Sequence, residues 1–161
     1  MSKKLASHND FLSPQEHERL RRYFEQHVSW IFGSQSDRWV LPLGHWNHEF
    51  LHTDPRNQEA ADALLAADPK NEPIYALWQS IKQRLLPDHE LVRCYANAHT
   101  YGNEGYPHYD HRYAGNCTTI VYLNPFWSPA WGGETVFINE FDEPPPPSSL
   151  SEPSVSSLAT M

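Results

Sequence analysis

Cysteine and basic residues are scarce in this sequence, and each shortage argues against a class of protein. Only Cys94 and Cys117 occur, and they form neither a C-x-x-C pair nor a zinc-ligand spacing. Both lie in strand-like segments, so we interpret them as small buried apolar residues. Twelve Lys and Arg against twenty Asp and Glu leave a net charge of −8. This charge argues against a nucleic-acid partner, because such affinity comes from clustered positive charge.

Long hydrophobic runs are also missing. No stretch approaches the roughly 18 apolar residues of a membrane span, and no apolar signal region follows the first four residues. We therefore expect no membrane partner and a cytoplasmic location. The 161 residues are 39% hydrophobic and 13% aromatic, which suits one folded domain.

The first half of the chain has the apolar spacing and start signals of helices. We expect helices from about Pro14 to Trp30, from Pro55 to Ala67 and from Glu72 to Leu85. The first begins at Ser13-Pro14-Gln15-Glu16, which combines a serine cap, a proline at the first helical position and a capping-box glutamate. Residues 1–12, which precede this signal, are polar and are predicted to be a mobile arm.

Beyond Glu90 the hydrophobic period changes from helical to alternating. Strands are predicted at Leu91–Ala98, Cys117–Asn124 and Gly133–Asn139, with Trp39–Leu41 as a further short candidate in an otherwise irregular region. Helices followed by strands predict an α+β fold in which the helices support one sheet.

The composition changes abruptly after Asp142. Four consecutive prolines, Pro144 to Pro147, are followed by a serine-rich segment. Such a segment buries too little apolar surface to offset its ordering entropy, so residues 143–161 are predicted to be disordered. A polyproline ligand for a partner domain is the alternative interpretation. The folded domain is then expected to span residues 13–142.

The tripeptide pattern H-x-D is the first candidate for a functional site. It occurs at His8/Asp10, His52/Asp54 and His108/Asp110. Only the third copy follows a predicted strand and precedes two more. If residues 108 to 110 are extended, the imidazole and the carboxylate point to the same side. They would supply two-thirds of the 2-His-1-carboxylate site typical of non-haem Fe(II).

Further residues around this pair carry a family resemblance. They are Val92-Arg-Cys-Tyr95, Gly105-Tyr-Pro-His-Tyr-Asp110, Ile120-Val-Tyr-Leu-Asn124 and Trp131-Gly-Gly-Glu-Thr-Val-Phe137. Together they resemble the Fe(II)/2-oxoglutarate dioxygenase domain of the prolyl 4-hydroxylase type. The resemblance implies a double-stranded β-helix, or jelly roll, with N-terminal helices packed on it.

The resemblance also implies a site and a reaction. His108 and Asp110 match two iron ligands, Tyr122 matches a tyrosine that binds 2-oxoglutarate, and Tyr101 and Tyr95 would line the same pocket. The implied cofactors are Fe(II) and the co-substrate 2-oxoglutarate, with ascorbate as a further candidate. The implied reaction couples oxidative decarboxylation of 2-oxoglutarate to hydroxylation of a peptide or small molecule, and nothing in the sequence selects that substrate.

Two expected elements of that family are missing from the sequence. The distal histidine has no counterpart, because His111 is the only histidine after Asp110, and no Arg follows Arg112. The cation that would pair with 2-oxoglutarate is therefore missing too. His111, His99 and Glu134 are the candidate substitutes for the third ligand, and Glu134 is the best placed if residue 111 lies on a regular strand.

Three hypotheses follow. The chain is an oxygenase whose late strands are lost through truncation, a frameshift or a split gene, so that its activity is impaired. Alternatively, it is a non-catalytic binding module descended from that fold. A different metal enzyme, such as a zinc hydrolase, is the third hypothesis, although no H-E-x-x-H motif occurs. Where the late strands are missing, we expect unpaired strand edges and self-association through them, whereas a stable, monomeric and metal-free fold would favour the second hypothesis.

Overall fold

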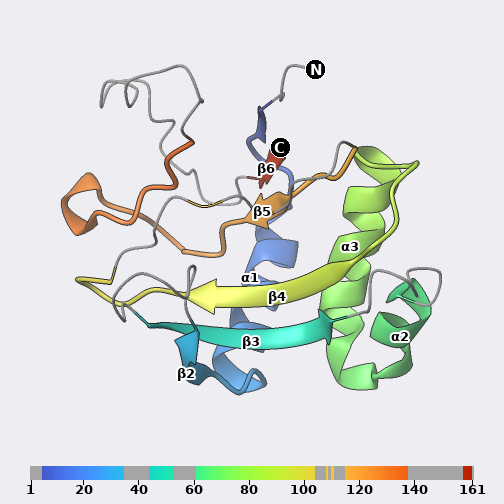
Figure 1. Cartoon of the computed structure of the whole chain (residues 1–161), viewed down its shortest axis with the longest axis horizontal. Coiled ribbons are helices and arrows are strands. Elements are labelled where there is room, and N and C mark those ends of the chain that lie inside the picture. Colours follow the sequence, from blue (N-terminus) through green and yellow to red (C-terminus); the bar gives the residue numbers. More distant parts are fainter. Residues whose placement is uncertain are drawn as a thin grey trace. The chain divides into compact units, whose positions relative to one another are not determined.

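The computed structural model describes residues 5–34, 44–52, 61–103, 108, 110, 115–137 and 158–160. Its elements in chain order are β1 (Ala6–His8), α1 (Pro14–Gln26), β2 (Ile31–Ser34), β3 (His45–His52), α2 (Ala61–Ala67), η2 (Pro69–Asn71), α3 (Glu72–Arg84), β4 (Arg93–Ala98), β5 (Thr119–Val121), η3 (Pro129–Trp131) and β6 (Leu158–Thr160) (Figure 1). The predicted α+β class is confirmed, but the described residues show no jelly roll. They form two compact units, one of residues 22–34 and 44–98, the other of described residues within 5–21, 99–137 and 158–160.

Helix α1 begins at the predicted residue, and the predicted capping box caps its N-terminus. The Ser13 hydroxyl and backbone N–H both donate to a Glu16 carboxylate oxygen, at 2.6 and 2.7 Å. The Glu16 N–H donates in return to the Ser13 hydroxyl at 3.3 Å. The helix ends at Gln26, four residues before the predicted Trp30, because the chain continues into β2 instead. Ile31, the residue after the predicted end of the helix, is the first residue of that strand and is 72% exposed.

We expect the Ser13→Ala variant to lower the free energy of unfolding by about 1 kcal/mol, since it removes a side-chain cap. Urea denaturation measures the change. Gln15→Ala is the matched control, because Gln15 is an exposed residue of the same first turn. Equal stabilities of the two variants would show that the cap contributes nothing.

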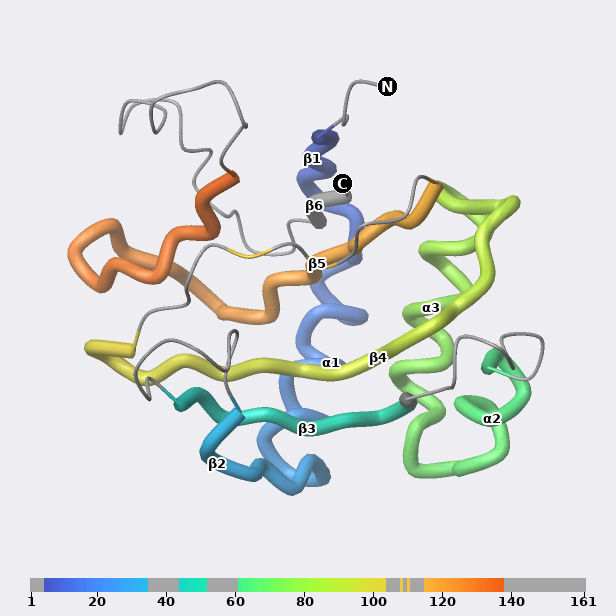
Figure 2. The backbone as a smooth tube through the Cα atoms, viewed as in Figure 1, coloured from blue at the N-terminus to red at the C-terminus, as the bar shows by residue number. Residues whose placement is uncertain are grey.

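The sheet of the first unit has the strand order β2-β3-β4, and all its pairs are antiparallel. Strand β4 confirms the prediction for residues 91–98, starting two residues later, and its residues alternate between exposed and partly buried. Figure 2 traces β3 and β4 side by side along their length. The central strand β3 was not predicted, since its His, Asn and Glu residues have low strand preference and its pairing with β4 is non-local.

Helices α2 and α3 supply much of the buried apolar surface of this unit. Helix α2 packs against α3 and β3. Five of their side chains are buried: Ala61, Leu65, Ile74, Trp78 and Ile81. Both helices confirm predictions, although residues 53–60, where the first helix was expected to start, lie outside the described residues.

One polar cluster joins α2, α3 and the segment that follows. The Lys82 ammonium lies 3.0 Å from carboxylate oxygens of both Asp62 and Glu90. The other Asp62 oxygen accepts from the Trp78 indole N–H at 2.8 Å. These hydrogen bonds raise the pKa of Lys82. The cluster therefore links α2, α3 and the segment that follows α3 through one ammonium group.

The second unit contains a sheet of order β1-β6-β5. Residues 6–8 and 158–160 belong to segments expected to be a mobile arm and a disordered tail, yet β6 pairs with both β1 and β5. The rest of the tail and the candidate strand at 39–41 lie outside the described residues. Strand β5 is shorter than the predicted Cys117–Asn124.

The prediction of a strand at Gly133–Asn139 is wrong over its described part. Residues 133–137 form no strand. Gly132 and Gly133 have φ of 64° and 84°, which turns the chain out of an extended path just before the alternating residues. Thr135 instead accepts a hydrogen bond from Tyr122. No helix in the described part of the chain is long and apolar enough to cross a bilayer.

Candidate metal-binding site

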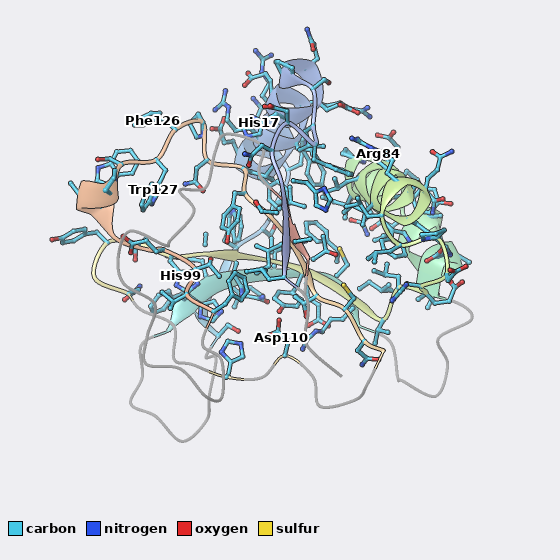
Figure 3. The ribbon with its side chains drawn as sticks, turned by 90° about the horizontal axis from the view of Figure 1, so that it is seen from above. His17, Arg84, His99, Asp110, Phe126 and Trp127 are labelled. Atoms are coloured by element: carbon cyan, nitrogen blue, oxygen red, sulfur yellow. The ribbon has the colours of Figure 1, made fainter. Side chains whose placement is uncertain are left out.

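His108 and Asp110 meet in the loop that joins β4 to β5. The His108 Nε2 atom lies 3.2 Å from Asp110 Oδ1. The Asp110 side chain, labelled in Figure 3, is 16% exposed, and the His108 side chain is 42% exposed. The two donor groups are therefore adjacent and open to solvent on the histidine side.

The reason for this convergence differs from the one inferred from sequence. Neither residue is in a strand, and Asp110 occupies a bend. The strand argument for His108 and Asp110 is therefore wrong in its cause. The two side chains nevertheless approach each other, as that argument expected.

The distance suits two different interactions. At 3.2 Å an imidazole nitrogen and a carboxylate oxygen make a hydrogen bond or, when the ring is protonated, an ion pair. Two donors each about 2.1 Å from one ion, at a right angle to each other, would lie about 3.0 Å apart. The pair therefore fits two adjacent positions around a divalent cation with little rearrangement.

A third protein ligand does not join this pair among the described residues. In that part of the chain, no group of three His, Cys, Asp or Glu side chains could hold a metal ion. His99 and Glu134, both described, therefore do not complete the site. Desolvation lowers the pKa of His99. His111, the remaining candidate, lies outside the described residues.

The three tyrosines expected to bind 2-oxoglutarate have different surroundings. The Tyr122 hydroxyl donates to the Thr135 hydroxyl oxygen at 2.6 Å. Tyr101 is 93% exposed in a turn after β4. Tyr95 lies on β4 in the other unit, where the Arg93 guanidinium carbon is 4.8 Å from its ring centroid.

Thr135 is the residue that sequence reasoning missed. It was read as part of a strand, and its hydroxyl is the observed partner of Tyr122. The only signal for it was its place after Gly132-Gly133, which indicated a turn or bulge.

The comparisons with known proteins add no family: no protein-family model matches the chain, and no curated protein or solved structure does so either.

Proposed function

We propose that this chain is a domain of the Fe(II)/2-oxoglutarate oxygenase type, in which His108 and Asp110 hold the metal. The observation that carries the proposal is the 3.2 Å approach of His108 Nε2 to Asp110 Oδ1. The motif resemblance around the pair supports the same proposal, as does the antiparallel pairing of each strand that flanks the loop, β4 with β3 and β5 with β6. Under this proposal those strands belong to a jelly roll.

The described residues fit such a site only in part. His108 and Asp110 would supply two ligands, and the metal with 2-oxoglutarate and O2 would supply oxidative chemistry. Tyr122 would bind 2-oxoglutarate only if its hydroxyl could also be reached beside Thr135. No third ligand is found in the described part of the chain.

Weak metal binding and low turnover are the expected consequences. Two protein ligands constrain the coordination geometry of a metal ion less than three protein ligands do. A charge-assisted hydrogen bond of the kind that a basic residue makes to 2-oxoglutarate is worth about 1.5–3 kcal/mol. Its absence lowers affinity by roughly ten- to a hundredfold.

A non-catalytic binding module is the second candidate. Two observations favour it: the described residues offer no third ligand, and the Tyr122 hydroxyl is already bonded to Thr135. Under this alternative, the His108–Asp110 contact is a structural contact of the loop.

Metal titration tests the first proposal. Mn(II) replaces Fe(II) because it is stable in air and takes the same oxygen and nitrogen ligands. We expect Asp110→Asn to weaken Mn(II) binding at least tenfold, since a neutral amide replaces the carboxylate ligand. Asp88→Asn is the matched control, an exposed acid in a turn of the other unit. Equal Mn(II) affinity of wild type and Asp110→Asn would reject the site.

Succinate release separates the two candidates. The purified chain, loaded anaerobically with Fe(II) and then given 2-oxoglutarate and O2, is expected to release succinate slowly, and His108→Ala none. Mn(II) binding without any succinate above the His108→Ala background would favour the binding module. Fast turnover by the wild type would contradict the expected impairment.

A further inference from the structure

An exposed aromatic pair lies in the second unit, in the loop after β5. The Phe126 and Trp131 side chains are 62% and 48% exposed. Their ring centroids are 5.0 Å apart, and their planes are inclined by 54°. We call this pair the aromatic platform. Figure 3 shows Phe126 and the neighbouring Trp127 on the loop that leads into η3.

Hydrogen bonds within the loop hold the platform in shape. The Trp127 indole N–H donates to the Gly132 carbonyl at 3.0 Å. The Trp131 N–H donates to the Ser128 carbonyl at 2.9 Å, and the Gly132 N–H to the Pro129 carbonyl at 3.3 Å. A surface ordered before binding loses little conformational entropy on binding, so rings held this way are suited to a ligand.

Charge limits what the platform can bind. Glu134 is the only charged residue among residues 115–137. Adjacent exposed aromatic rings on a segment with so little charge favour an uncharged ligand with an apolar face. A phosphate-bearing ligand does not fit, because no Lys or Arg lies in this segment.

The chain itself contains a ligand of that kind. Pro144–Pro147 followed by Ser148-Ser149-Leu150 is uncharged, and consecutive prolines favour the polyproline II helix. Proline-rich segments in that conformation dock on aromatic-lined surfaces at low entropic cost. We propose that the platform formed by Phe126 and Trp131 is a docking surface for the proline run Pro144–Pro147 of the same chain.

Connectivity favours the same chain over a separate one. Pro144 is seven residues beyond Phe137, the last described residue before the run, and seven extended residues span up to roughly 25 Å. On the other side of the run, Leu158 of β6 pairs with Val121, five residues before Phe126. Both ends of the connection thus belong to the unit that carries the platform. Such a tether gives an effective concentration on the order of millimolar.

A competition experiment with the full chain tests the docking. The probe is a labelled synthetic peptide with the sequence of residues 144–152. One variant changes each of the four prolines Pro144–Pro147 to serine, which vacates the platform under this proposal. We expect the peptide to bind this variant roughly tenfold more tightly than wild type, since the tethered run competes at an effective concentration near millimolar.

Substitutions in the platform locate the binding surface. In the four-serine variant, Phe126→Ala and, separately, Trp131→Ala should each weaken peptide binding at least tenfold. Phe32→Ala, which removes an exposed ring on β2 outside the platform, should leave it unchanged. Circular dichroism melts of all variants establish that they fold.

Three outcomes would overturn the proposal. One is equal peptide affinity of wild type and the four-serine variant. Another is peptide binding that survives both platform substitutions or does not occur up to millimolar peptide. The third is a wild-type dimer, seen by light scattering, that the four serines dissociate, because the run would then occupy the platform of a second copy.

Discussion

Replacing Leu65 with alanine is expected to lower the free energy of unfolding by about 2–5 kcal/mol. Leu65 is the largest fully buried side chain among the described residues, with 0% exposure. It lies on α2, which packs against α3 and β3, so the shortened side chain leaves a cavity on a surface shared by three elements. Natural domains are stable by only about 5–15 kcal/mol, so this one change removes a large share of the total.

The neighbouring residue supplies the control for this prediction. Leu64 lies on the same helix but is 50% exposed. Leu64→Ala should change stability by less than about 1 kcal/mol, because little apolar surface returns to water and alanine favours the helix. Urea denaturation of both variants measures the difference. Similar losses for Leu64→Ala and Leu65→Ala would contradict the burial of α2 described above.

The Cys94 thiol is expected to react on the order of a thousandfold more slowly in the folded chain than in the unfolded chain at pH 8. Burial on β4 raises its pKa to about 12. The thiolate is the nucleophile, and an ordinary thiol with a pKa near 8.5 is about a quarter ionised at that pH. A Cys117→Ser background isolates Cys94, and iodoacetamide labelling followed by mass spectrometry gives the rate. The chain in guanidinium chloride is the reference, and a folded rate within tenfold of it would contradict the prediction.

The raised pKa of Cys94 also predicts that the free energy of unfolding depends on pH. Above about pH 8.5 the unfolded thiol loses its proton while the folded thiol keeps it, so ionisation favours the unfolded state. The unfolding free energy is therefore unaffected below that pH and falls as pH rises toward 12. Between pH 7.5 and 9.5 the expected loss from Cys94 is about 1.4 kcal/mol. Cys94→Ala should lack this loss, and an unchanged pH dependence in that variant would refute it.

Local signals account for the elements that were predicted correctly. The start of α1 depends on Ser13, Pro14 and Glu16, which satisfy the first N–H groups within four residues. Helix α3 and strand β4 likewise follow periodic patterns that are complete within their own segments. Such patterns need no information about distant parts of the chain.

The missed elements depend on distant partners. Strand β3 pairs with β4 about fifty residues later, and its own composition does not favour a strand. The end of α1 has the same origin, since residues 31–34 pair with β3 instead of extending the helix. Conversely, residues 133–137 alternate as a strand would, but the positive φ angles of Gly132 and Gly133 turn them away from one.

By itself, the sequence determined the α+β class, the cap of α1 and the His108–Asp110 pair as the candidate metal site, because these depend on neighbouring residues. Only the tertiary structure decided that the pair meets through a bend, that Tyr122 donates to Thr135 and that Phe126 and Trp131 form one exposed surface. Each of these depends on the direction of irregular backbone, which is set by bends, positive φ angles and the hydrogen bonds within loops. A period of two or 3.6 residues cannot encode them.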